Sequence, residues 1–121
     1  MSKKILIVED EELIAKVLSM RLEGLGYKVV TAADGEEGLE LARKERPDLA
    51  ILDIGLPRID GNTLCELIKN DPATGDIKII MLTGMKLVGD METSFNSGAE
   101  VYVTKPYEWP RLLGHIKKLL G

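Results

Sequence analysis

The feature of this sequence that most limits its fold is a regular alternation of short apolar runs with amphipathic stretches. The runs are rich in β-branched residues, and continuous apolar runs of this length are typical of strands covered on both faces. They occupy residues 5–8, 29–31, 49–52, 79–82 and 101–103. Five strands in series with helical connections predict an α/β fold, a doubly wound parallel sheet of the (βα)5 type.

The first amphipathic stretch predicts a helix whose apolar residues share one face. Its apolar residues recur at helical spacing, and Gly24 and Gly26 follow as stop signals. The residues assigned to that single face are Leu13, Ile14, Val17, Leu18 and Leu22.

Capping patterns mark the starts of two further helices. Asp34 with Glu37 three residues later resembles a capping box, and Asp60 can cap the helix that follows it. A last helix covers residues 112–120. Between residues 87 and 95 the apolar spacing is workable but poor helix formers interrupt it, so we expect a short, mobile helix there.

Length and composition bound the class of protein. The 121 residues, 45% of them hydrophobic, suit one domain spanning 1–121. A net charge of -4 argues against nucleic-acid binding by this domain. The single cysteine, Cys65, excludes an internal disulfide, and the run at 5–8 is too short for a signal peptide or membrane span. We therefore expect a soluble, cytoplasmic protein.

Carboxylates, a hydroxyl and an ammonium group follow the predicted strands. Because ligands bind beyond the carboxyl ends of parallel strands, we expect these residues on one rim of the sheet: Glu9, Asp10, Asp53, Thr83 and Lys105. Closely packed carboxylates repel one another, and Mg²⁺ relieves that repulsion while leaving room for phosphate. One carboxylate can then attack phosphorus, with the metal and an ammonium neutralising the phosphoryl oxygens and a hydroxyl donating to one of them.

Several short motifs, in order along essentially the whole chain, resemble the receiver domain of two-component response regulators. The motifs are Val8-Glu9-Asp10-Glu11, Asp53 followed by Leu56-Pro57 and Asp60-Gly61, Leu82-Thr83-Gly84, Gly98-Ala99 and Lys105-Pro106. The resemblance implies a chemotaxis-regulator-like, flavodoxin-like fold with strand order 2-1-3-4-5. It also implies a cis peptide bond between Lys105 and Pro106.

The resemblance implies a role for each matching residue. Asp53 is the phosphoacceptor, and Lys105 pairs with it or with the phosphoryl group. Asp10, Asp53 and the backbone carbonyl of Gly55 hold Mg²⁺, with Glu9 acting mostly through water. Thr83 and Tyr102 are the switch pair. The sequence alone leaves Tyr102 open between a switch role and a structural one.

Partners also follow from the resemblance. A sensor histidine kinase or histidine phosphotransfer protein donates the phosphoryl group, and slow self-dephosphorylation is expected in place of enzymatic turnover. The output is a downstream protein or a covalently linked effector domain, with a phosphorylation-linked homodimer as a further expectation. We expect the output face to combine the segment at 87–95, the strand at 101–103 and the last helix.

Three positions depart from the commonest family pattern. Gly55 replaces a larger side chain and should open the site to water, whereas the bulky Met85 can shield it. Glu108 is a poorer cap than a short polar residue, although Pro110 suits a first helical turn.

Alternative functions stay open. A degenerate, phosphorylation-independent interaction module would not require the complete set of acids and lysine. A haloacid-dehalogenase-like phosphohydrolase carries a second Asp two residues after its nucleophile, where this chain has Gly55. A nucleotide or flavin binder would place a glycine-rich loop after the first strand, where this chain has acids.

Overall fold

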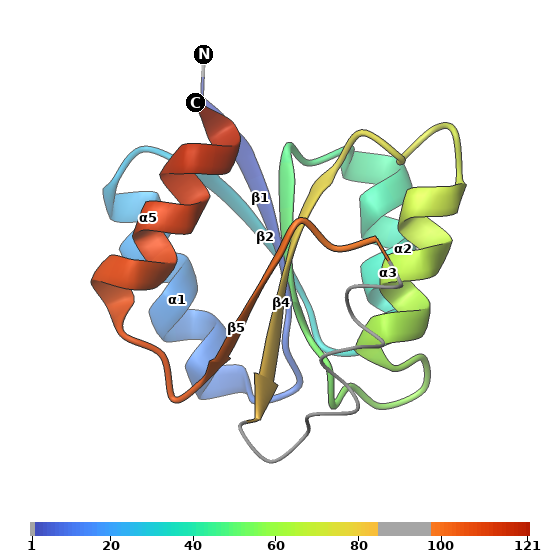
Figure 1. Cartoon of the computed structure of the whole chain (residues 1–121), viewed down its shortest axis with the longest axis horizontal. Helices are drawn as coiled ribbons and strands as arrows, with labels where there is room; N and C mark the ends of the chain where they lie inside the picture. Colours follow the sequence, from blue (N-terminus) through green and yellow to red (C-terminus); the bar gives the residue numbers. More distant parts are fainter. Residues whose placement is uncertain (1, 85–97) are drawn as a thin grey trace.

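A computed structural model, which describes residues 2–84 and 98–121, contains a five-stranded parallel sheet between two layers of helices (Figure 1). The strands are β1 (Lys4–Val8), β2 (Lys28–Ala32), β3 (Leu49–Asp53), β4 (Lys78–Gly84) and β5 (Val101–Lys105). They are ordered β2-β1-β3-β4-β5. The predicted fold class and strand order are therefore confirmed.

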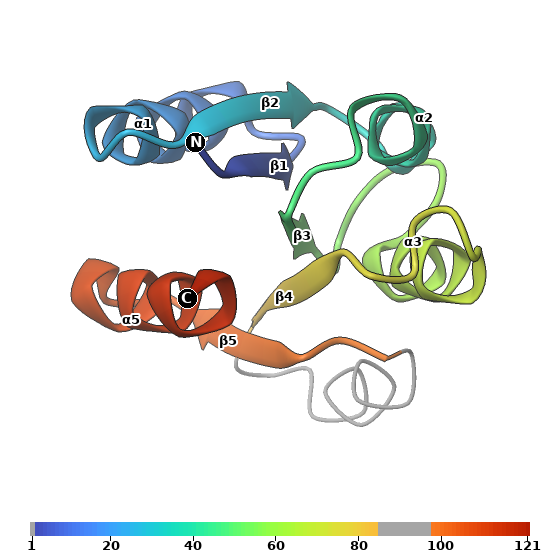
Figure 2. The same ribbon diagram turned by 90° about the horizontal axis from the view of Figure 1, so that it is seen from above.

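The described helices lie on both faces of the sheet. They are α1 (Glu12–Gly24), α2 (Gly35–Glu45), α3 (Gly61–Asn70) and α5 (Trp109–Leu120). The helices α1 and α5 cover one face, and α2 and α3 cover the other (Figures 1 and 2). None of the described helices is long and apolar enough to cross a membrane. The helix predicted at residues 87–95 lies outside the described residues.

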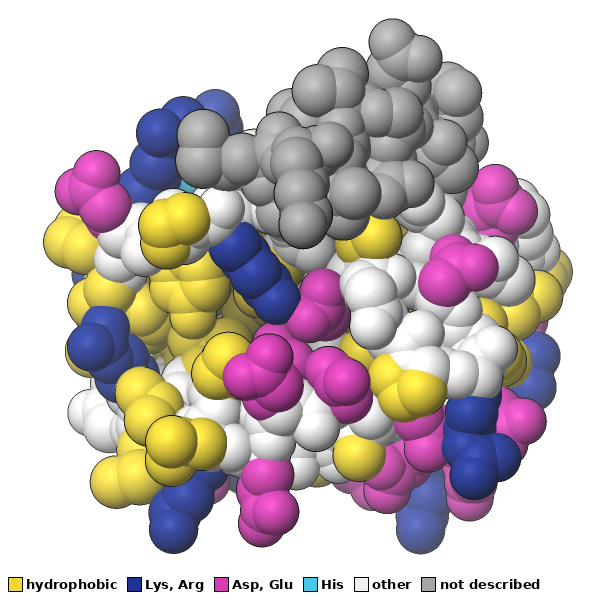
Figure 3. Space-filling model, turned by 90° about the horizontal axis from the view of Figure 1, so that it is seen from below, with side chains coloured by type: hydrophobic (Ala, Val, Ile, Leu, Met, Phe, Trp, Pro, Cys, Tyr) yellow, Lys and Arg dark blue, Asp and Glu magenta, His cyan; other side chains and the backbone are white. Residues whose placement is uncertain are grey.

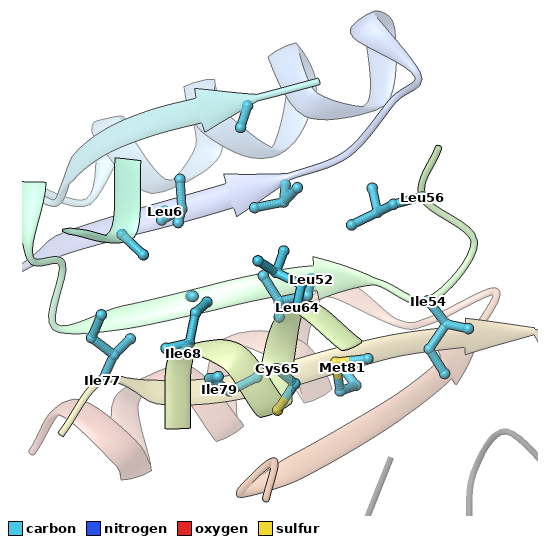
Figure 4. Packing of buried hydrophobic residues seen from close by; sticks show 14 residues of the cluster. Leu6, Leu52, Ile54, Leu56, Leu64, Cys65, Ile68, Ile77, Ile79 and Met81 are labelled. Carbon is cyan, nitrogen blue, oxygen red and sulfur yellow. The ribbon is translucent and has the colours of Figure 1, made fainter. Parts of the chain in front are cut away.

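Successive side chains of a strand point to opposite faces of the sheet, which divides the core into two clusters. Ile5 and Ile7 pack with the residues of α1 and α5, whereas Leu6 and Val8 pack with those of α2 and α3. Figure 4 shows the second cluster, in which Leu52 of β3 lies near Leu64 of α3. Both faces of each inner strand are thus buried, which explains why their sequences are continuously apolar.

The predicted helix starts are confirmed. The Asp34 carboxylate accepts a hydrogen bond from the Glu37 amide at 2.9 Å, and the Glu37 carboxylate accepts one from the Ala33 amide at 2.8 Å. The Asp60 carboxylate accepts from the Thr63 amide at 2.9 Å. Glu108 makes no side-chain cap at the start of α5, as expected of a poorer capping residue.

The single apolar face predicted for α1 is divided in the structure. Leu18 and Leu22 are buried, together with Ala15, but Leu13, Ile14 and Val17 are exposed. The helix carries two apolar stripes, and only the one at Ala15, Leu18 and Leu22 faces the sheet. The sequence pattern merged the two stripes because residues three and four positions apart are neighbours on either face of a helix.

The start of α3 packs directly on the backbone at the end of β3. The Gly61 amide donates to the Ile54 carbonyl oxygen at 3.0 Å. A Cβ atom on Gly61 would lie 2.7 Å from the Ile54 Cα and would clash with the carbonyl oxygen of Asp53. A glycine is therefore needed at this position for the helix to come so close.

We predict opposite effects of alanine at two helical glycines. Gly61→Ala should destabilise the fold by about 1–3 kcal/mol because backbone atoms must move. Gly114→Ala in α5 is the matched control, since its Cβ meets no atom within 4 Å. That change should stabilise the fold by about 1 kcal/mol through helix propensity. Urea denaturation measures both, and equal effects of the two changes would contradict the packing described for Gly61.

Candidate functional site

Three acidic side chains meet at the carboxyl ends of two neighbouring strands. Glu9 and Asp10 follow β1, and Asp53 ends β3, whose residue Leu52 pairs in register with Val8. One oxygen from each carboxylate lies within 4.8 Å of the other two. Figure 3 shows acidic side chains gathered near the middle of this face of the molecule. The sequence prediction of an acidic cluster on this rim is confirmed in its geometry.

The lysine at the end of β5 reaches into this cluster. Its Nζ lies 2.7 Å from Oδ2 of Asp53 and 3.6 Å from Oε1 of Glu9. Burial by itself would lower the pKa of Lys105, but the hydrogen bond to Asp53 and the negative charges of Asp53 and Glu9 outweigh it and raise the pKa. Lys105 is therefore a cation at neutral pH and lies beside the carboxylates of Asp53 and Glu9.

Glu9 is the buried member of the acidic cluster. Its Oε2 accepts a hydrogen bond from the Glu11 amide at 3.1 Å, whereas its Oε1 is buried and has no hydrogen-bond partner among the described residues. Burial raises the pKa of Glu9 to about 6, and the Asp53 charge adds to this against the opposing effects of Glu11 and Lys105. The cluster thus carries more negative charge than Lys105 alone balances, and a further cation is a natural ligand for it.

The second oxygen of Asp53 faces the loop that follows β3. Asp53 Oδ1 accepts a hydrogen bond from the Gly55 amide at 3.1 Å. A Cβ atom on Gly55 would meet only this oxygen, at an ordinary contact distance of 3.9 Å. A larger side chain would fit at this position, so Gly55 leaves the Asp53 carboxylate less covered than most residues would.

Contacts that the sequence analysis did not find hold this loop against α2. Ile59 packs over Gly35, where any Cβ would clash with it. Arg58 has a left-handed backbone, with φ of 69°, and its guanidinium lies 3.5 Å from the carboxylates of both Asp34 and Glu36. The available signal was the glycine directly after the cap at Asp34, because a glycine there marks a close approach of another segment.

The two residues expected to form a switch lie on neighbouring strands. Thr83 of β4 is buried and follows Leu82, which pairs in register with Asp53. Tyr102 of β5 pairs with Met81 and packs, partly buried, against the core on the α2 and α3 side. The Lys105–Pro106 peptide bond is cis, as the resemblance implied.

Comparison with known proteins identifies the family. The response regulator receiver domain matches residues 5–117. The chain belongs to this family. A curated relative, the DNA-binding dual master transcriptional regulator RpaA of Synechocystis, is 40% identical over 97% of this chain and 48% of its own length. This receiver domain therefore spans about half the length of the first curated relatives it matches.

Solved structures agree with the fold. A CheY-like receiver domain protein from Methanospirillum hungatei is 38% identical, with a TM-score of 0.91 over 98% of this chain and 94% of its own. The receiver domain of the sensor histidine kinase PA1611 from Pseudomonas aeruginosa is 30% identical, with a TM-score of 0.91 over 100% of this chain and 99% of its own. In that protein a magnesium ion is coordinated in the active-site cleft.

Removing the Glu9 charge should stabilise the metal-free receiver domain. A carboxyl pKa raised to about 6, from an ordinary value of 4.5, means that the native state binds the proton more tightly than the unfolded chain does. Ionised Glu9 therefore costs stability above pH 6, and this cost disappears as the pH falls to 4.5. Glu9→Gln should be about 1–2 kcal/mol more stable than wild type at pH 7.5.

Urea denaturation in EDTA across this pH range measures the difference. The stability gained by Glu9→Gln should shrink as the pH falls from about 6 to 4.5, because wild-type Glu9 then becomes protonated beside Asp10, Asp53 and Lys105. A variant less stable than wild type at pH 7.5, or a difference that does not vary with pH, would contradict this account of Glu9.

Proposed function

We propose that this receiver domain is a phosphoacceptor switch that takes a phosphoryl group on Asp53 from a histidine kinase or a histidine phosphotransfer protein. The observation that supports this most is the 2.7 Å contact between Lys105 and Asp53 inside a cluster of three carboxylates. A nucleophilic carboxylate needs a cation at hand to neutralise the incoming phosphoryl oxygens. Lys105 supplies that cation from a different strand.

The donor set fits Mg²⁺. Carboxylate oxygens of Asp10 and Asp53 would hold the ion, together with the backbone carbonyl of Gly55, and Glu9 would act through water. The buried Oε1 of Glu9, which accepts no hydrogen bond from the described residues, supports this assignment because it leaves negative charge for a cation to balance. When bound, the metal would supply charge neutralisation for the phosphoryl oxygens.

The chain's own residues would carry the transfer. One Asp53 oxygen attacks phosphorus and forms an acyl phosphate as the bond from phosphorus to the donor's imidazole nitrogen breaks. The imidazole leaves with the bonding electron pair and takes up a proton. The Lys105 ammonium can then move its hydrogen bond from Asp53 to a phosphoryl oxygen. The exposed surroundings of Gly55 admit water, so we expect slow hydrolysis of the acyl phosphate.

The signal would spread through strands beside the acceptor. The Thr83 hydroxyl would donate to a phosphoryl oxygen, and Tyr102 on the next strand would change its packing in response. Phosphorylation would thereby shift an equilibrium between two conformations of the face that includes β5 and α5. The output would be a partner protein or an attached effector domain in the cytoplasm, or a phosphorylation-linked homodimer.

Acetyl phosphate tests the acceptor. Incubation with acetyl phosphate and Mg²⁺ should add the mass of one phosphoryl group to wild type, detected by intact-protein mass spectrometry. Asp53→Asn should add none, because the amide is not a nucleophile for this reaction. Asp76→Asn is the matched control, since Asp76 is exposed in the loop before β4 and should leave the gain unchanged.

The outcomes separate the candidate functions. A phosphoryl gain that persists in Asp53→Asn would place the acceptor elsewhere. Wild type that gains no mass with either acetyl phosphate or a phosphorylated kinase would instead support an interaction module that works without phosphorylation.

Mg²⁺ should raise the melting temperature of the folded domain. Binding to the native state at ten times the dissociation constant adds about 1.4 kcal/mol of stability. For a chain of this size that is an increase of about 5 °C. Asp53→Asn should lose most of this increase, because one of the carboxylates that would hold the ion is gone. Thermal denaturation with millimolar MgCl₂ that leaves the wild-type curve unchanged would contradict the metal assignment.

A further inference from the structure

The loop between β3 and α3, residues 54–60, contains the residue whose backbone carbonyl would help to hold Mg²⁺. Ile54 and Leu56 are buried in the core (Figure 4). Gly55 between them is exposed and has no side chain that could anchor it. Its amide donates to Oδ1 of Asp53 at 3.1 Å, but that carboxylate is the group that would bind the metal and the phosphoryl group. The placement of Gly55 therefore depends on its buried neighbours and on what holds the rest of the loop.

The second half of the loop is held against the start of α2. The Gly35 amide donates to the Pro57 carbonyl oxygen at 3.4 Å. The guanidinium of Arg58 adds two ion pairs, with Nε 3.5 Å from Oδ2 of Asp34 and Nη1 3.5 Å from Oε2 of Glu36. The three residues contacted on this side are consecutive in the sequence, so one end of α2 receives this part of the loop.

The Asp34 carboxylate is a fixed partner for the arginine. Its Oδ1 caps α2 by accepting a hydrogen bond from the Glu37 amide at 2.9 Å, whereas its Oδ2 faces Arg58. Exposed ion pairs are individually weak, in part because two long side chains lose their freedom when they pair. Here one acid has already lost that freedom to the cap, and a second acid shares the same guanidinium. The two pairs together can therefore restrain the loop.

The backbone of Arg58 also indicates that its side chain helps to hold the loop. Its φ of 69° is left-handed, a conformation that glycine accepts and that a Cβ atom disfavours. A residue with a side chain stays in this conformation only where contacts around it hold it there. The ion pairs with Asp34 and Glu36 are contacts of this kind.

We propose that Arg58 is a positioning residue for the metal site. It ties the loop after β3 to α2 and thereby keeps the backbone of Gly55 beside Asp53. The inference rests on the proposed function, because it takes Gly55 and Asp53 to hold Mg²⁺. Without the ion pairs the loop would sample more arrangements, and binding of Mg²⁺ would have to order it, which lowers the affinity.

The sign of the effect separates positioning from simple electrostatics. A cation near the acidic cluster repels Mg²⁺, so by charge alone the removal of the Arg58 charge should strengthen Mg²⁺ binding. Positioning predicts the opposite. Arg58→Gln keeps the Cβ atom but removes both ion pairs, and it should weaken Mg²⁺ binding about 3-fold, as expected for pairs of this kind. Isothermal titration calorimetry with MgCl₂ measures the dissociation constant.

Arg46→Gln is the matched control. Arg46 is also an exposed arginine with a left-handed backbone, with φ of 45°. It follows α2 and precedes β3, so it lies at the opposite end of that strand from Asp53. The control removes the same charge from the same backbone conformation and should leave the affinity for Mg²⁺ unchanged. Thermal denaturation in EDTA checks that both variants are folded.

Two further measurements test the route through α2. Glu36→Gln removes one partner of Arg58 and leaves the cap at Asp34 in place, so it should also weaken Mg²⁺ binding. In the Arg58→Gln background it should add little, because the pair is already broken. Hydrogen exchange of the Gly55 amide in EDTA should become faster in Arg58→Gln and stay unchanged in Arg46→Gln.

The outcomes distinguish this proposal from the metal assignment. Wild type that binds no Mg²⁺ would overturn both. Wild type that binds Mg²⁺, with Arg58→Gln binding it as tightly or more tightly, would overturn the positioning role alone. An Arg46→Gln control that loses as much affinity, or a Gly55 amide that exchanges at the wild-type rate in Arg58→Gln, would also overturn the positioning role.

Discussion

The contact between the Lys105 ammonium and the Asp53 carboxylate is the interaction on which the site depends. The two residues end strands β5 and β3, which are not neighbours, so β4 must lie between them at the right register. The parallel arrangement brings both strand ends to one rim, and this order separates them by a single strand. Without the ammonium, three carboxylates with ligand atoms within 4.8 Å would repel one another unrelieved. Burial is the main cause of the raised pKa of Glu9, and the charge of Asp53 adds to it in spite of this cation.

The closely spaced charges that suit the site to its function also destabilise the fold at this rim. The inner strands are apolar and packed on both faces, whereas the closely spaced charges lie at the rim where the strands end. Glycines at 35 and 61 let the neighbouring segments pack closely against the loop after β3. A scaffold held so firmly can keep an unfavourable group of charges in place. That unfavourable charge is also what makes the site receptive to a metal ion and a phosphoryl group.

The features that depend on short-range patterns in the sequence could be predicted. Apolar runs gave the strands, and acids placed directly after them gave the cluster, because the carboxyl ends of parallel strands meet at one edge. The pattern placed Leu13 and Val17 on the same face as Leu18 and Leu22, because a helix with two apolar stripes has the same local pattern as one with a broad stripe. It also missed the contact of Ile59 with Gly35 and the left-handed Arg58, since these arise from how two distant segments meet.

The site depends on the charge coupling between Lys105 and Asp53, and a double-mutant cycle in EDTA measures this coupling directly. The four proteins are wild type, Asp53→Asn, Lys105→Met and the double variant, each unfolded in urea at pH 7.5. Removing Lys105 should destabilise wild type strongly and the Asp53→Asn protein much less. We expect a coupling free energy of at least about 1 kcal/mol. Effects that add to within about 0.3 kcal/mol would contradict the account.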